Sequence, residues 1–252
     1  MGERMLRYDV ESSPQTYARV GGALYLMLIG LGGVGLFARD TLIVASDPTV
    51  TAVNITTNES LWRLGIAAEL AALICAIVLA MIYFVLLEPV SRELNLVATF
   101  LRLVATAIQA VAILNLAAAL FPLGNAAYLK AFTPDQLYAM TRLAIRSHAY
   151  GYGLSLLFFG SCFLAHGRLI FRSGFLPKSL GILIQVAGLC YLTNSFTLFL
   201  APNIYEQIFP AILLPAFVGE VSLCFWLLVK GVNVERWRQA SADMRRLRQA
   251  GA

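Results

Sequence analysis

Six long apolar runs divide this 252-residue chain, and they restrict its possible folds more than any other feature. The runs cover about residues 17–38, 60–87, 94–121, 149–171, 179–200 and 211–230. Each is close to the ~20 apolar residues that an α-helix needs to cross a bilayer. Backbone amides find no water inside lipid, so spanning segments must be helices or closed barrels. The sequence therefore predicts an all-α integral membrane protein, a bundle of six transmembrane helices.

The composition agrees with a membrane protein and excludes other classes. Apolar residues make up 59% of the chain and charged residues 13%, whereas soluble domains carry roughly 25% charged residues. The net charge of +5 is concentrated in the tails and loops, where it indicates topology and lipid headgroup contact. No basic groove interleaved with aromatic residues occurs, so we expect no nucleic-acid partner. The cysteines (Cys75, Cys162, Cys190, Cys224) all fall within spans without a CxxC pair, which favours buried free thiols.

Two connectors carry signals for short amphipathic helices at the membrane interface. In the first connector, Asp47 precedes Pro48, and an aspartate cap followed by proline starts a helix. In the third, a helix begins at Thr133–Pro134, and Gln136 completes a capping box. The apolar residues of this second helix share one face. We expect it to lie at the interface and to lead into the fourth span.

The distribution of Lys and Arg predicts the orientation, because basic loops stay in the cytoplasm. An even number of spans places both termini on one side. Most basic residues belong to that side: Arg4, Arg7, Arg19, Arg92, Arg168, Arg172, Lys178 and the tail from Lys230. The other side holds Arg39, Arg63, Lys130, Arg142 and Arg146. We therefore predict a cytoplasmic N-terminal tail (residues 1–16), a transmembrane domain (17–230) and a basic cytoplasmic tail (231–252).

The C-terminal tail has the pattern of a helix on a membrane surface. Trp237, Met244 and Leu247 recur at helical spacing between arginines. Such a basic amphipathic helix is expected to bind anionic lipid headgroups. The bilayer and these headgroups are the partners that the sequence indicates, and it leaves the oligomeric state open.

Several polar residues within the spans are candidates for binding a ligand or a proton: Glu220, Glu69, His148, Asn115, Asn194 and Arg63. At ~1.5 Å per residue, Glu69 and Glu220 both lie roughly 13 Å below the outer surface. Polar residues in spans face the bundle interior, which favours an outward-facing polar cavity. Two carboxylates close together in low dielectric cannot both ionise cheaply, so one should hold a proton. These residues suit a transporter or sensor that binds a small molecule or ion, with possible proton coupling.

Two other interpretations stay open. In a structural or accessory subunit, Glu220 would pair with Arg102, and Glu69 with Arg63. In an intramembrane metal-assisted hydrolase, His148 would act with Glu69 and Glu220. These residues supply few metal ligands, because the second histidine, His166, lies roughly 27 Å from His148 along the same helix. The sequence indicates no catalytic residue, resident metal or cofactor, and it favours a protein that is not an enzyme.

Five strings of the chain resemble the bacterial membrane family catalogued as domain of unknown function 4386. They are RLGIAAEL (63–70), FLRLVATAIQAVAILN (100–115), HAYGYGLSLLFFG (148–160), RSGFLPKSLGILIQVAGLCYL (172–192) and PAFVGEVSLCFWLLVKG (215–231). The resemblance implies a bacterial six-span helical protein. With the charge distribution, it indicates a multi-pass protein of the inner membrane. It implies no reaction, ligand or catalytic residue.

Overall fold

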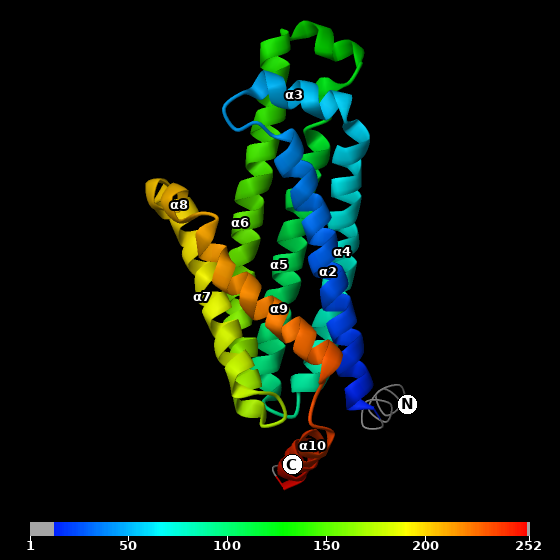
Figure 1. The fold of residues 1–252 in the computed structure, drawn as a ribbon, viewed down its shortest axis with the longest axis vertical. Helices are drawn as coiled ribbons and strands as arrows, with labels where there is room; N and C mark the ends of the chain where they lie inside the picture. The colour runs from blue at the N-terminus through cyan, green and yellow to red at the C-terminus, as the bar shows by residue number, and fades with distance from the viewer. Residues whose placement is uncertain (1–12, 251–252) are drawn as a thin grey trace. The chain divides into compact units, whose positions relative to one another are not determined.

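A computed structural model describes residues 13–250, and every regular element within that range is helical (Figure 1). In the labels of Figure 1, the helices are α2 Pro14–Leu42, α3 Pro48–Thr57, α4 Glu59–Leu87, α5 Arg92–Ala118, η1 Phe121–Leu123, η2 Ala127–Ala131, α6 Pro134–Ser173, α7 Lys178–Leu200, α8 Pro202–Ile208, η3 Ala211–Leu213, α9 Leu214–Val229 and α10 Val234–Ala250.

Six segments of this range are long and apolar enough to cross a membrane. They are formed by α2, α4, α5 with η1, α6, α7, and η3 with α9. The predicted all-α membrane bundle is therefore confirmed. The predicted N-terminal tail with Arg4 and Arg7 lies mostly outside the described residues, as do residues 251–252.

The chain divides into two compact units, which are described separately. Unit 1 comprises Met1–Leu26, Ala76–Ala105 and Leu156–Ala252. Unit 2 comprises Met27–Cys75 and Thr106–Ser155. Each unit contains segments of several spans and has its own buried polar side chains.

The predicted helix of the first connector, α3, is present in unit 2. Asp47 caps it: Oδ1 accepts hydrogen bonds from the backbone N of Thr49 at 2.9 Å and of Val50 at 3.0 Å. Ile55 on its buried face joins a core around Trp62. The indole Nε1 of Trp62 donates to the carbonyl of Leu116 at 3.0 Å, which ties α4 to α5.

The helix that begins at Pro134 differs from the prediction in one respect. The capping box forms as expected, since Thr133 N donates to Gln136 Oε1 at 2.9 Å. The helix is not a separate short element, however, because α6 runs for 40 residues from Pro134 to Ser173. No proline or glycine lies between Asp135 and Tyr150 to interrupt it. The third connector is instead built from the short turns η1 and η2.

Glycines allow close contact between the helices of unit 1. A Cβ atom on Gly181 of α7 would lie 2.6 Å from the backbone N of Phe171 and 2.7 Å from the carbonyl O of Gly167, both on α6. A Cβ atom on Gly219 of α9 would lie 2.9 Å from the carbonyl O of Leu183 on α7. The helices α7 and α9 pack side by side (Figure 1). Small residues at such contacts let backbones approach closely, which favours helix association in lipid.

Hydrogen bonds join the start of α2 to the end of α9. The side chain of Gln15 donates from Nε2 to the carbonyl O of Lys230 at 2.8 Å. Its Oε1 accepts from the backbone N of Val232 at 3.0 Å. Between them, Gly231 has φ +68°, a conformation that glycine adopts without steric cost. These contacts end the sixth span and direct the chain into α10.

Within unit 1, Trp237 attaches the basic helix α10 to the end of α4. Its side chain is only 3% exposed, and its Nε1 donates to the carbonyl O of Leu86 at 2.9 Å. Beside it, Arg236 donates to the carbonyl O of Gly174 at 3.0 Å. The predicted amphipathic helix therefore forms, with its tryptophan buried in protein, while Leu247 is 71% exposed.

Replacing Trp237 with alanine should lower the free energy of unfolding by about 3–5 kcal/mol, as for other buried tryptophans. Trp237→Phe should cost less, since it keeps most of the apolar contact and removes one hydrogen bond worth about 1 kcal/mol. Thermal unfolding in detergent and proteolysis of α10 measure both effects. An alanine variant as stable as wild type, with α10 equally protected, would show that the helix is not held by this contact.

Candidate functional site

A buried polar cluster in unit 1 receives a side chain from each of the six spans. The contributing residues are Tyr25 of α2, Tyr83 of α4, Arg102 of α5, His166 of α6, Tyr191 of α7 and Glu220 of α9. All are buried except Tyr191, which is partly exposed. Such a grouping of ionisable residues within spans marks a candidate site, because each is costly to bury in lipid.

Glu220 is held by two tyrosine hydroxyls from different helices. Tyr25 OH donates to Oε2 at 2.9 Å, and Tyr191 OH donates to Oε1. Both carboxyl oxygens therefore have donors, although the residue is only 8% exposed. Hydrogen bonds to a charged group are worth about 1.5–3 kcal/mol each. They offset much of the cost of placing an acid in the apolar helix α9.

Arg102 supplies the positive charge of the cluster. Its guanidinium lies over the ring of Phe159, with 4.5 Å between Cζ and the ring centroid. This is a cation–π contact, which stabilises a cation away from water. The ring of Phe159 also contacts Tyr191, with 5.4 Å between centroids. The charge of Arg102 acts on Glu220 and on Tyr25. The sequence had suggested Arg102 as an ion-pair partner of Glu220, and the structure places the two residues in one cluster.

Tyr83 and His166 form the other side of the cluster. Their ring centroids are 5.2 Å apart, and Tyr83 also packs edge-on against Tyr25 at 6.4 Å. The Nδ1 atom of His166 lies 3.3 Å from Cys162 Sγ. Among the described residues, Tyr83 OH and His166 Nε2 have no hydrogen-bond partner, although both atoms are buried. Unsatisfied buried polar groups are rare in proteins, so these two atoms stand out as hydrogen-bonding groups that lack a partner in the described part of the chain.

Unit 2 contains a separate buried ion pair between Arg39 of α2 and Glu69 of α4. Arg39 Nη1 contacts Glu69 Oε1, with side-chain exposures of 21% and 7%. Gly35 makes room for the acid, since a Cβ atom there would lie 2.6 Å from Glu69 Oε1. A cavity of about 10 Å³ beside the pair is lined partly by Gly35 and Gly65, a volume that suits one water molecule.

The suggested pairing of Glu69 with Arg63 is wrong. Arg63 instead binds Glu59, with 2.7 Å between Nε and Oε1, and its side chain is 63% exposed. The reason is helix geometry: residues four apart on a helix face each other, whereas a separation of six places Arg63 and Glu69 on different faces.

Of the other predicted site residues, His148 and Asn115 contact backbone carbonyl groups, and Asn194 has a buried oxygen without a hydrogen-bond partner in the described chain. His148 is buried, with its Nδ1 3.1 Å from the carbonyl O of Ala112. Asn115 donates to the carbonyl O of Val111 on its own helix at 3.3 Å. Asn194 is 2% exposed, and its Oδ1 has no hydrogen-bond partner within the described chain. Glu220 belongs to unit 1 and Glu69 to unit 2, so their sharing of one cavity stays a prediction.

Removing one partner of the Arg39–Glu69 pair should be more harmful than removing both. Arg39→Gln should destabilise the protein by about 3 kcal/mol, because Glu69 is left as an uncompensated buried charge. The double variant Arg39→Gln/Glu69→Gln should recover most of this loss. A double-mutant cycle on the unfolding free energy measures the coupling. Additive effects of the two substitutions would show that the pair contributes no interaction energy.

Sequence reasoning missed four members of the cluster: Tyr25, Tyr83, Tyr191 and His166. Tyrosines in membrane proteins are enriched at the interface, but Tyr25 and Tyr191 lie well inside predicted spans. A tyrosine in the middle of an apolar span was therefore the sequence signal that could have identified Tyr25 and Tyr191. Arg39 was missed as a site residue because it was assigned to the first connector, whereas α2 continues to Leu42.

The structure gives no sign of a preformed metal centre in residues 13–250. No three side chains of His, Cys, Asp or Glu gather there to hold an ion. The four cysteines are buried and free, as their positions predicted.

Fold and site together define the class of this protein: a six-span α-helical membrane protein with a polar cluster in its interior. Residues 20–231 match the family described as Domain of unknown function (DUF4386), and the chain belongs to this family. The predicted resemblance is confirmed, and the match includes all six cluster residues. An uncharacterized protein of Archaeoglobus fulgidus is 33% identical over 78 residues, which are 31% of this chain and 44% of that protein. The aligned stretch thus covers less than half of this relative, and the likeness extends to an archaeal protein. No solved structure matches the chain.

Proposed function

We propose that this protein binds a small polar solute within its bundle and couples that binding to proton exchange at Glu220, as a transporter does. The observation that carries the proposal is the cluster itself, to which each of the six spans contributes one side chain. A ligand that binds to members of this cluster can bias the arrangement of the helices that carry them. A ligand shifts a conformational equilibrium only through different contacts with the two states, and this cluster offers such contacts.

Proton exchange at Glu220 would change the hydrogen bonding between helices. The ionised carboxylate only accepts hydrogen bonds, and both of its oxygens have tyrosine donors. A protonated carboxyl group becomes a donor itself. Where this new O–H group donates to the hydroxyl of Tyr25 or Tyr191, that hydroxyl has to turn and accept the hydrogen bond. Protonation therefore acts directly on the contact of α9 with α2 or α7.

The solute is proposed to bind near Tyr83 and His166. Their available atoms, Tyr83 OH and His166 Nε2, can donate or accept hydrogen bonds. The charge of Arg102 acts on both residues. This set of groups favours a small solute with hydrogen-bonding oxygens.

We further propose that the protein lies in the bacterial inner membrane with both ends cytoplasmic. The excess of Lys and Arg near the termini supports this orientation. The bond between Gln15 and Lys230 supports placing the start of the first span and the end of the sixth on the same side. In this topology, Tyr83 lies four residues before the cytoplasmic end of α4 and His166 seven residues before that of α6, roughly 6 Å and 10 Å along the helices, so the solute site lies nearer the cytoplasmic face.

A solute screen followed by a proton measurement tests the proposal. Solutes that raise the melting temperature of the detergent-solubilised protein are identified first. A pH-indicator dye in weak buffer then reports proton uptake or release on binding. Tyr83→Phe should weaken solute binding about tenfold, the equivalent of one hydrogen bond of about 1.4 kcal/mol. Tyr128→Phe is the control, because that side chain is 66% exposed. Binding that is equal in both variants and exchanges no protons would refute the proposal.

A further inference from the structure

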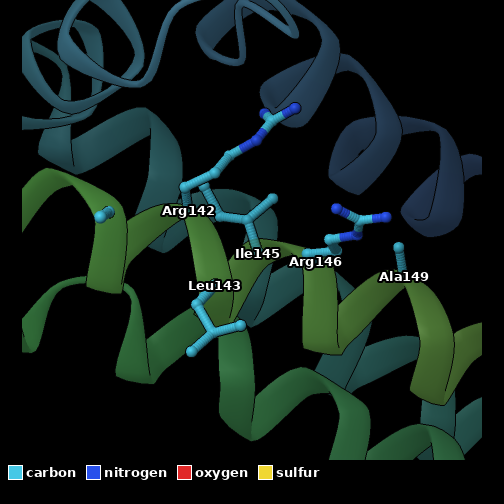
Figure 2. Close-up of a pocket in the computed structure, with 6 residues that line it drawn as sticks. Arg142, Leu143, Ile145, Arg146 and Ala149 are labelled. Atoms are coloured by element: carbon cyan, nitrogen blue, oxygen red, sulfur yellow. The ribbon is translucent and has the colours of Figure 1, made fainter.

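A groove on α6 lies in unit 2, apart from the polar cluster of unit 1 on which the proposed function rests. Its volume is about 400 Å³, and it is lined by Ala139, Arg142, Leu143, Ile145, Arg146 and Ala149. Figure 2 shows Arg142 and Arg146 on successive turns of α6, both extending to the same side, while Leu143 extends to the other.

Protein contacts position both arginines. Arg142 donates from Nη2 to the carbonyl O of Ala45 at 2.8 Å. The guanidinium of Arg146 lies 6.0 Å from the ring centroid of Tyr150. Two like charges four residues apart on a helix repel each other. An anion between them would remove this repulsion and bind both guanidinium groups, whose planar N–H donors match phosphate oxygens.

The length of α6 places this groove at the level of lipid headgroups. A helix of 40 residues is about 60 Å long, twice the ~30 Å of the hydrocarbon core. One end must therefore project beyond the hydrocarbon region. The apolar part of α6 follows His148, so Arg142 and Arg146 lie within about two turns of its edge. Leu143, 66% exposed at the same level, fits a helix that contacts lipid.

We infer that the groove binds one anionic phospholipid, with the phosphate between Arg142 and Arg146. The exposed Ala149, one turn nearer the apolar part, leaves room for the first carbons of an acyl chain. The position of α6 against α3 and the first connector would then depend on this lipid, because Arg142 bridges to Ala45. This site is independent of Glu220.

Native mass spectrometry and thermal unfolding of the full-length protein with phosphatidylglycerol test the inference. Arg142→Gln/Arg146→Gln should lower the affinity for this lipid at least tenfold and abolish the rise in melting temperature that it causes. The matched control is Arg168→Gln/Arg172→Gln, which removes two exposed arginines at the same spacing from the same helix. The control should change the affinity less than twofold. Equal losses in both double variants, or no loss in either, would overturn the inference.

Two further measurements separate loss of lipid binding from misfolding, and a lipid from a free phosphate compound. Arg146→Gln alone leaves the bond from Arg142 to Ala45 in place, and it should still weaken lipid binding several-fold, which separates binding from misfolding. If this variant folds and binds phosphatidylglycerol like wild type, the inference fails. Soluble glycerol phosphate is the second probe. It should bind far more weakly than the lipid, whereas equal stabilisation by glycerol phosphate would assign the groove to a free phosphate compound and not to a lipid.

Discussion

Replacing Glu220 with glutamine is expected to reduce proton exchange on solute binding at least tenfold while the protein stays folded. Glutamine has nearly the same shape and keeps one oxygen that can accept a tyrosine hydroxyl, and its amide can donate to the other. The two contacts of Glu220 with Tyr25 and Tyr191 can therefore be kept as neutral hydrogen bonds. What is lost is the group that titrates. Stability should change by only about 1 kcal/mol, the net difference between such hydrogen bonds.

The control for this prediction is Glu59→Gln, which makes the same chemical change at a site that is 48% exposed. Glu59 pairs with Arg63 at the helix surface, and exposed pairs contribute only about 0.2–1 kcal/mol. Proton exchange should be unaffected there. If Glu220→Gln exchanges protons as wild type does, or if both variants lose exchange equally, Glu220 is not the coupling group.

Gly181→Ala is expected to lower the free energy of unfolding by about 2 kcal/mol or more. Overpacking a well-packed core typically costs about 1–3 kcal/mol. The added Cβ would meet the backbone N of Phe171 at 2.6 Å and the carbonyl O of Gly167 at 2.7 Å. Both are main-chain atoms of α6, which cannot rotate away as a side chain could. The helices α6 and α7 would have to separate, and neighbouring contacts such as that between Gly160 and Gly188 would loosen.

Gly32→Ala provides the matched comparison in another span. A Cβ atom on Gly32 has nothing within 4 Å, and alanine is favoured over glycine in helices by about 1 kcal/mol. This variant should be neutral or more stable. Chemical or thermal unfolding in the same detergent compares the two. A Gly181→Ala protein as stable as Gly32→Ala would mean that α6 and α7 do not pack as closely as the structure shows.

The six-span architecture could be predicted because it depends on local properties of the chain. The length of each apolar run can be read directly from the sequence. The cap at Asp47–Pro48 and the capping box of Thr133 and Gln136 each depend on only a few neighbouring residues. The continuity of α6 was harder to predict, since a polar helix end and an apolar helix body have different compositions. Nothing between Asp135 and Tyr150 breaks the backbone, however, and the helix simply continues from one environment into the other.

The candidate site was predictable only in part, because it depends on contacts between distant segments. The cost of burying a charge identified Glu220, Glu69 and Arg102 as residues that need partners. The partners themselves were not determined by spacing. Glu69 pairs with Arg39, thirty residues away in sequence, where Gly35 leaves the required space. Glu220 is bound by Tyr25 and Tyr191, whose hydroxyls carry no charge and so gave no signal in a charge-based search.

Infrared spectroscopy across a pH titration tests the central claim, that Glu220 takes up and releases a proton inside the bundle. The carbonyl band of a protonated carboxyl group should appear and disappear reversibly in the wild-type protein. The component of this band that belongs to Glu220 should be absent from Glu220→Gln and shifted in Tyr191→Phe, which lacks one hydrogen bond to the carboxyl group. An identical titration in wild type and Glu220→Gln would contradict the claim.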